Sequence, residues 1–368
     1  MLDVLIVGGG PVGLFLGCRL AQLGFAVRVL EPRTEPRAHS RAIGVHPPAL
    51  ERLAKLGLAD AFVREGVRIA YGHAYAGAKR LGTRRLGTLS FTDLPGPYPF
   101  ILTLPQPRTE ALLEGRLREL EPDALLRAEV RGLEQHADNV NVTLATGERL
   151  TARFLVAADG KTSFVRNALQ ILFRGRSYPD HYLMGDFHDT TAFGTDAALY
   201  FTRAGLVESF PLPGGLRRWV AKTPEHVSAP TPKILAGLIQ ERLGVSLPVA
   251  TNSMLSAFGI QRFLADRFTL GRVALVGDAA HVVSPIGGQG MNLGWLGAWR
   301  LAECLAAGDL SGYAAHRRSA RRAVVRAEFN TVMGRATPVA GVRDAAIWSI
   351  LHGPLNGPFA RLFTMRGL

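Results

Sequence analysis

Gly8-Gly9-Gly10-Pro11-Val12-Gly13 joins the apolar run Asp3–Val7 to a helical stretch, and the apolar run Ala26–Leu30 follows. This order predicts a strand, a helix and a second strand. Pro11 stands in the first helical turn, where proline is tolerated best. Gly8 would permit the tight turn, Gly10 would let a pyrophosphate approach the backbone, and Gly13 would let the helix pack on the strands. The segment therefore predicts a dinucleotide-binding unit.

Glu31 ends the second predicted strand. A carboxylate at this point accepts hydrogen bonds from the ribose hydroxyls of an adenosine and repels a 2′-phosphate, so FAD or NAD suits the site better than NADP. The helix begins at Pro11 and Val12, and the N–H groups of its first turn after Pro11 are available to the phosphates. We place Pro32 and Arg33, which follow Glu31, at the same cofactor site.

Two later stretches place an aspartate and a glycine directly after an apolar run. The run Phe154–Ala158 leads into Asp159-Gly160, and a strand predicted over residues 273–276 leads into Gly277-Asp278. Ligands of α/β sheets bind outside the carboxyl ends of the strands, so Asp278 is placed to accept hydrogen bonds from a sugar-alcohol chain. The loop Gly287–Gly290 opens a helix at Met291-Asn292. Its N–H groups would stabilise the negative charge that a flavin acquires on reduction.

The three motifs, in this order, resemble those of the FAD-dependent aromatic hydroxylases, the single-component flavin monooxygenases related to para-hydroxybenzoate hydroxylase. The resemblance covers about residues 1–330. It implies an α/β fold in which a Rossmann-like FAD-binding domain is interrupted by an antiparallel β-sheet substrate domain and followed by C-terminal helices. It also implies that Gly8, Gly10, Gly13 and Glu31 hold the ADP part of FAD. Asp159-Gly160 would contact both FAD and NAD(P)H, although Ala157 stands where the family usually has glycine.

The remaining cofactor contacts of the family transfer to Arg41, Gln106, Arg108, Val130, Gly277, Asp278, Pro285, Gly288, Gly290, Met291 and Asn292. Asp278 would bind the ribityl chain, and the backbone of Val130 would meet the adenine. The matches at Arg41, Gln106 and Arg108 are weaker. The catalytic contribution is expected from the backbone at Pro285 and Gly288, which faces the flavin, and no side-chain nucleophile is expected.

With FAD bound, the resemblance implies a monooxygenase reaction. NADPH or NADH would reduce the flavin, O₂ would add to give a flavin C4a-hydroperoxide, and one oxygen atom would pass to a small organic substrate, expected to be aromatic. A second G-x-G-x-x-G is absent from the sequence, so the reductant would bind transiently, with Lys161 and Arg166 as candidate contacts. Two alternatives stay open: a reductase or dehydrogenase of the same fold, similar to isoprenoid reductases, and a non-catalytic FAD-binding protein with a basic partner-binding tail.

The pattern of elements predicts a discontinuous organisation. Residues 1–70, 100–176 and 264–335 form the predicted FAD-binding domain, and residues 71–99 and 177–263 form the predicted substrate domain. No long helical period dominates residues 177–263. Residues 336–368 form a predicted C-terminal helical tail, in which Val339, Val342, Ala346, Ile347 and Ile350 indicate an amphipathic helix over residues 338–352. We expect this helix to pack on the body of the protein, with docking on a membrane surface as the less favoured alternative.

Composition limits the remaining function classes. The chain has 368 residues, of which 47% are hydrophobic and 20% charged, and its 43 Lys and Arg against 30 Asp and Glu give a net charge of +13. The two cysteines form no metal-ligand spacing, so no metal site is expected. The N-terminus lacks a secretory leader and no run spans a bilayer, so we expect a cytoplasmic protein without a transmembrane segment. Its oligomeric state stays open.

A cluster of arginines, Arg317, Arg318, Arg321, Arg322 and Arg326, lies in a helical stretch near the end of the chain. A solvated face is the favoured interpretation, an acidic partner or membrane surface the second, and nucleic acid is not expected because aromatic residues are not interleaved. The substrate pocket is expected among residues of the inserted sheet. Its candidates are Tyr98, Phe100, Tyr182, Tyr200, Phe210 and Trp219, with His73 and His188 as polar ones.

Overall fold

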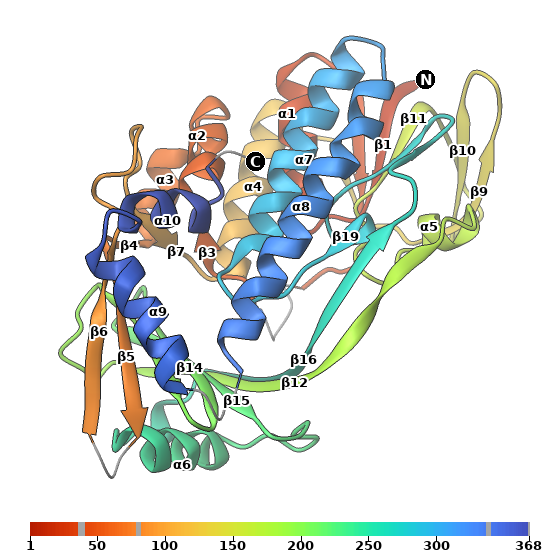
Figure 1. The fold of residues 1–368 in the computed structure, drawn as a ribbon. Coiled ribbons are helices and arrows are strands. Elements are labelled where there is room, and N and C mark those ends of the chain that lie inside the picture. Colours follow the sequence, from red (N-terminus) through yellow and green to blue (C-terminus); the bar gives the residue numbers. More distant parts are fainter. Residues whose placement is uncertain (36–40, 79–81, 336–339, 367–368) are drawn as a thin grey trace.

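The computed structural model describes residues 1–35, 41–78, 82–335 and 340–366, and its first layer is a mainly parallel sheet (Figure 1). The strands of this sheet are β1 (Leu2–Val7), β2 (Val27–Leu30), β8 (Leu125–Leu126), β9 (Val130–Gln135), β10 (Val140–Leu144), β11 (Arg149–Ala157), β17 (Thr269–Leu270) and β18 (Val273–Leu275). β1 pairs in parallel with both β2 and β11, and β11 pairs in parallel with β18. The carboxyl ends of these four strands therefore meet at one edge.

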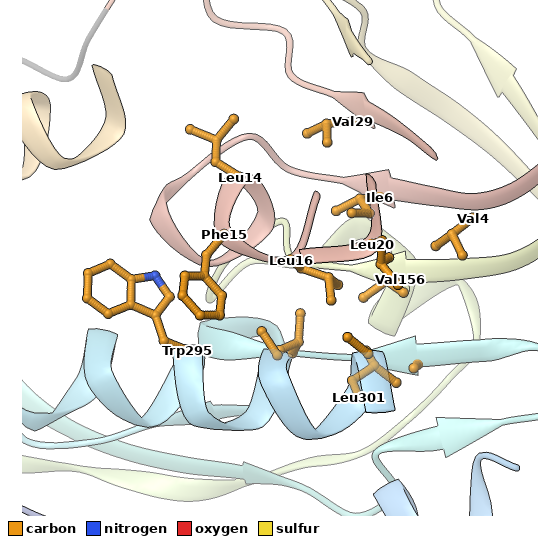
Figure 2. Close-up of a cluster of buried hydrophobic side chains, with 14 of the residues drawn as sticks. Val4, Ile6, Leu14, Phe15, Leu16, Leu20, Val29, Val156, Trp295 and Leu301 are labelled. Atoms are coloured by element: carbon orange, nitrogen blue, oxygen red, sulfur yellow. The ribbon is translucent and has the colours of Figure 1, made fainter. Parts of the chain in front are cut away.

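The helices that cover this sheet are α1 (Pro11–Gln22), α4 (Gln106–Leu120), α7 (Gln289–Ala306) and α8 (Ser311–Met333), which lie side by side in Figure 1. Phe15 of α1 stacks on Trp295 of α7, with ring centroids 5.7 Å apart, and both side chains are buried (Figure 2). Trp295 Nε1 also donates to the Pro11 carbonyl at 2.9 Å. An apolar strand such as Leu2–Val7 is stable here because both of its faces are covered.

A second sheet lies beside the first and contains β5 (Tyr71–Ala78), β6 (Gly82–Ser90), β12 (Phe173–His188), β13 (Ala197–Thr202), β14 (Gly205–Leu212), β15 (Leu216–Thr223), β16 (Met254–Ala265) and β19 (His281–Val282). The long strands β12 and β16 pair with each other and extend toward the first sheet (Figure 1). One face of the second sheet buries Trp219 and Ala221 against α6 (Pro232–Leu243). The side chains of the opposite face alternate with these.

Smaller elements complete the structure. A third sheet joins β3 (Gly44–Val45), β4 (Val67–Ile69) and β7 (Ile101–Thr103), and the remaining helices are α2 (Pro47–Lys55), α3 (Ala59–Glu65), α5 (Phe164–Ala168), α9 (Ala340–His352) and α10 (Asn356–Phe363). α9 and α10 lie against β6, as Figure 1 shows. The chain thus returns from the first sheet to cover the second.

The structure confirms the predicted fold class and corrects it in three details. β13 pairs with β5 in parallel, so the second sheet is not wholly antiparallel. Residues 177–263 contain α6, a helix that the sequence interpretation missed because its apolar residues form only a narrow stripe. The helix predicted over residues 338–352 is present as α9, but it buries Arg343, Asp344 and Ile347 and leaves Val342 71% exposed. Val339 and residues 336–338, 367 and 368 of the predicted tail lie outside the described residues.

Candidate cofactor and substrate cavity

A cavity of about 1060 Å³ lies between the carboxyl edge of the first sheet and the second sheet. Its wall combines the β1–α1 turn, the end of β2, the segment after β11, the loop before α7 and side chains of β13, β14 and β15. The four strand ends meet there because parallel pairing aligns Val7 with Leu30 and Ala157, and Ala157 with Leu275. The motifs that are distant in the sequence thus share one cavity.

The glycines of the β1–α1 turn have distinct physical roles. Gly8 has a φ of +108°, and a Cβ there would lie 2.3 Å from the Ala158 carbonyl oxygen. A Cβ at Gly13 would lie 1.9 Å from the Gly8 carbonyl oxygen. Gly10 differs, since it lines the cavity in an extended conformation and a Cβ there would meet no described atom within 4 Å. Gly8 and Gly13 are therefore required by packing, whereas Gly10 leaves space for a ligand.

Glu31 lies in the cavity wall, 5% exposed, with its carboxylate held by neighbouring donors. Gly9 N donates to Oε2 at 2.9 Å, and Arg33 donates to both oxygens through its backbone N–H and guanidinium. Burial raises the pKa of Glu31, but the hydrogen bonds from Arg33 and Gly9 outweigh this effect and hold the pKa below its ordinary value. The carboxylate is thus ionised, and a ribose hydroxyl would share it with Arg33.

Val12 connects the first and third motifs. A Cβ at Gly277, whose φ is +61°, would lie 3.2 Å from the Val12 side chain, and one at Gly294 of α7 would lie 2.5 Å from it. These glycines allow the β1–α1 turn to pack closely against the segment after β18 and against α7. Asp278, which follows Gly277, is exposed and lines the cavity. The structure therefore places this carboxylate beside the glycine turn.

The segment after β11 contributes a buried carboxylate. Asp159 Oδ2 accepts a hydrogen bond from Val165 N at 3.2 Å, while Oδ1 is buried with no partner among the described residues. Burial raises the pKa of Asp159 above its ordinary value, against hydrogen bonds that lower it. Arg166 does not face the cavity: it is buried and donates to the carbonyls of Ala279 and Lys161. Lys161 lines the cavity and contacts Gln261.

His46 and Asn292 fix the glycine loop before α7. Asn292 Nδ2 donates to the carbonyls of Gly44 and Gly288, both at 2.9 Å, and its Oδ1 accepts from His46 N at 2.8 Å. The His46 ring lies 3.1 Å from the Gly287 carbonyl through Nε2, and burial lowers its pKa to about 4. His46 is therefore neutral at pH 7, and its Nε2–H donates to Gly287. Sequence reasoning missed His46, for which no motif gave a signal.

One backbone N–H of the glycine loop before α7 does not face the cavity as expected from the sequence. Gly288 N donates to the Pro285 carbonyl at 2.9 Å, so this N–H closes a turn instead of facing the cavity. Gly288 has a φ of +66° and precedes α7, whose first N–H groups have no acceptor within the helix. The donors of the first turn of α7 that lie at the cavity are therefore those of Gly290 and Met291.

The cavity brings together most of the predicted cofactor residues. Those that line it are Gly8, Gly10, Pro11, Val12, Glu31, Pro32, Arg33, Arg41, Gln106, Val130, Asp159, Gly160, Gly277, Asp278, Pro285, Gly288, Gly290 and Met291. Gly13 and Asn292 lie behind the wall and shape it. Arg108 is not brought to the cavity, because its exposed guanidinium pairs with Glu65 at 2.8 Å.

Most of the predicted substrate residues do not line the cavity: of the eight candidates, only Phe210 does. Tyr200 and Trp219 pack together on the α6 face of the second sheet, and Tyr182 stacks on Phe258. His73 contacts Asp196, and His188 is exposed. The apolar residues that line this part of the cavity include Phe91, Met184, Leu199, Phe201, Leu206, Val220, Phe258, Ile286, Ile347 and Phe363. Strand alternation explains Tyr200 and Trp219, because their neighbours Leu199 and Val220 face the cavity on the opposite side of the sheet.

FAD fits the residues that are present. Gly10 leaves the wall open, the first turn of α7 offers N–H donors, and Asp159 has an unpartnered buried oxygen at the wall. In the part of the chain that the structure describes, no group of His, Cys, Asp and Glu is arranged to hold a metal ion. Among these same residues, no helix is long and apolar enough to cross a membrane.

Comparisons with known proteins agree with this geometry. A family model described as FAD binding domain matches residues 1–327. Rifampicin monooxygenase of Streptomyces venezuelae is 35% identical over 324 residues, which are 85% of this chain and 66% of that protein. An anhydrotetracycline 6-monooxygenase of Streptomyces rimosus, which is also named 12-dehydrotetracycline 5-monooxygenase, is 32% identical over 355 residues, 88% of this chain and 68% of that protein. The chain thus spans about two thirds of the length of these relatives.

Solved structures show the same likeness. The p-nitrophenol 4-monooxygenase of Pseudomonas putida superposes with a TM-score of 0.88 and 25% identity, covering 99% of this chain and 97% of that one. An aklavinone-11 hydroxylase in complex with FAD and aklavinone gives a TM-score of 0.79 with 26% identity, covering 93% of this chain and 70% of that one. The chain therefore belongs to the FAD-binding-domain family that includes the flavin-dependent aromatic monooxygenases.

Proposed function

We propose that this protein is an FAD-dependent monooxygenase that hydroxylates a small aromatic compound, with NADPH or NADH as transient reductant and O₂ as co-substrate. The observation that carries the proposal is that the dinucleotide turn and the apolar face of the second sheet line one continuous cavity. A cofactor held at Gly10 and Asp278 would thus meet a substrate held on that face. The relatives support this proposal, while neither a reductase nor a non-catalytic role gains support from them.

When bound, FAD would supply the redox and oxygen chemistry, and the protein would supply position and environment. Glu31 and Arg33 would hold the adenosine, Asp278 the ribityl chain, and the first turn of α7 the flavin edge that becomes negative. His46 and Asn292 would fix the loop that borders the ring. The apolar side chains of β13, β14 and β15 would exclude water from the reacting atoms.

A glycine-to-alanine pair tests the cofactor site. Gly10→Ala adds a methyl group where no described atom lies within 4 Å, so the fold should persist while the pyrophosphate loses its space. Gly115→Ala in α4 is the matched control, since its position is equally open but lies on an exposed helix face. We expect circular dichroism of both variants to match the wild type and FAD affinity to fall at least tenfold only in Gly10→Ala. Equal flavin occupancy in all three proteins would contradict the assignment.

The reaction is tested with purified protein loaded with FAD. NADPH oxidation and O₂ uptake are followed against a panel of phenols and polycyclic aromatics, with ¹⁸O₂ and mass analysis of the products. Incorporation of one labelled atom per product supports hydroxylation. Reduction of a substrate without O₂ would instead support the reductase, and bound FAD without turnover would support a non-catalytic role.

A further inference from the structure

Glu208 is the acidic side chain of β14 that faces the cavity on its second-sheet side. It follows Leu206 and precedes Phe210 on the same face, and its partners in register are Leu199 of β13 and Val220 of β15. All four of these neighbours line the cavity and are apolar. The Glu208 carboxyl therefore lies in the apolar part of the cavity, on the wall that borders the loop containing Ile286.

Among the residues that the structure describes, the carboxyl of Glu208 has no partner. Glu208 is 4% exposed, and among the described residues no hydrogen bond or ion pair engages its oxygens, although buried carboxylates in proteins are ordinarily paired. Burial alone raises its pKa to about 8. A structural role does not account for such a group, because an apolar residue of similar volume would pack on this face at lower cost.

The charged groups around Glu208 are engaged elsewhere. On β15, Arg218 pairs with Asp186 of β12 at 2.7 Å, and Lys222 lies 3.6 Å from Asp180 of β12, which also pairs with Arg335. From β12, the Tyr182 hydroxyl is close enough to interact electrostatically with Glu208, and this hydroxyl is itself buried with no hydrogen-bond partner among the described residues. β13 presents only Ala197, Leu199 and Phe201 to the cavity. No cation of the described residues thus neutralises Glu208.

The Glu208 carboxyl, unpaired in an apolar cavity, requires a hydrogen-bonding group from the ligand. Below about pH 8 the carboxyl keeps its proton and can both donate and accept, whereas the carboxylate formed above this pH only accepts. An O–H group complements both forms, and the surrounding apolar side chains complement a ring. We propose that Glu208 is a substrate-recognition residue that accepts a hydrogen bond from the hydroxyl group of a phenolic substrate, and so selects phenols over aromatic rings that lack a donor. This inference rests on the proposed function for its substrate class.

A matched pair of ligands tests the proposal: 2-naphthol and 2-methoxynaphthalene, which differ in one O–H donor. Their dissociation constants are measured by calorimetry on the FAD-loaded protein between pH 6 and 9, a range in which phenols stay mostly protonated. At pH 9, where the Glu208 carboxyl is ionised, the wild type should bind naphthol roughly tenfold more tightly than the ether, as one hydrogen bond to a charged group gives. The ratio should rise with pH through about 8, since only the phenol stabilises the carboxylate.

Two variants isolate the carboxylate. Glu208→Gln keeps the volume and an acceptor oxygen, so it should retain a naphthol preference of a few fold without dependence on pH. Glu208→Leu should lower the preference below about threefold. Neither variant should change flavin occupancy, because Glu208 and its register partners Leu199 and Val220 are not among the residues assigned to FAD. Flavin absorbance is read on the same samples. Failure of the wild type to hold FAD would refute the proposed function, whereas the ratio of the two ligand affinities tests the role of Glu208.

The proposal is overturned if the ratio of naphthol affinity to ether affinity is the same in the wild type and in Glu208→Leu. It is also overturned by a ratio that responds to pH equally in the wild type and Glu208→Gln, or by the absence of saturable naphthol binding to the FAD-loaded wild type.

Discussion

Replacement of Glu208 by glutamine should stabilise the protein in a pH-dependent way. The structure raises the pKa of this carboxyl from its ordinary value of 4.5 to about 8 by burial. Below about pH 4.5 the group is protonated in both the folded and unfolded protein and has no effect. As pH rises toward 8, the unfolded chain ionises while the folded protein keeps its proton, so the free energy of unfolding falls; above about 8 the loss is complete.

The magnitude follows from the size of the shift. Each pKa unit corresponds to about 1.36 kcal/mol, so a shift from 4.5 to about 8 lowers the stability of the wild type by about 5 kcal/mol at alkaline pH. For a chain of 368 residues the entropy of unfolding is about 0.8 kcal/mol per kelvin, so the corresponding difference in Tm is roughly 6 °C. Glu208→Gln, which carries no ionisable group, should not undergo this loss.

Thermal unfolding followed by circular dichroism at pH 5, 7 and 9, with saturating FAD, measures the effect. The Tm of Glu208→Gln relative to the wild type should rise from pH 5 to about pH 8 and then level off. Glu225→Gln is the control, because Glu225 is exposed and its replacement should produce no such trend. A constant Tm difference between Glu208→Gln and the wild type across this range would refute the reasoning that Glu208 is buried without a partner.

Three further substitutions test the cofactor site and the core. Asp278→Ala should remove most of the FAD without unfolding the protein, since Asp278 is exposed, and full occupancy by flavin absorbance would reject its role. Asn292→Ala removes bonds to His46, Gly44 and Gly288, so FAD should bind at least tenfold more weakly; unchanged affinity in a fluorescence titration would contradict this. Phe15→Ala should lower the free energy of unfolding by about 3–5 kcal/mol, and a urea midpoint equal to the wild type's would exclude the stacked core of Figure 2 as a major contributor.

Three of the five clustered arginines lie on an exposed face of α8, in line with the solvated face expected from the sequence, while Arg317 and Arg326 are half-buried. Arg318, Arg321 and Arg322 are exposed on α8, whereas Arg317 donates to the Ala265 carbonyl at 2.7 Å. Ala320, Ala323, Val324 and Ala327 face inward from the same helix. The opposite faces of α8 therefore divide between solvent and core, and no described contact assigns the exposed arginines a partner.

The sequence by itself determined the cofactor end of the cavity. Its signals there are local: glycines at Gly8 and Gly13 are required by backbone contacts, and carboxylates follow directly after apolar strands at Glu31, Asp159 and Asp278. Parallel strands place residues at their carboxyl ends along one edge of the sheet, regardless of the length or conformation of the connecting segments. Because of this regularity, one short motif and two strand ends are enough to predict a shared site.

Only the tertiary structure decided the substrate end. Trp219 and Val220 are adjacent in β15, yet one packs against α6 and the other faces the cavity, and the sequence is apolar at both positions. The pairing of β12 with β16 joins the two sheets and decides which face of the second sheet meets the loop before α7. This is a long-range arrangement that no local pattern encodes. The tertiary structure likewise decides the roles of Glu208 and His46. Burial of each side chain, and the hydrogen-bond partners available to it, depend on residues far apart in the chain.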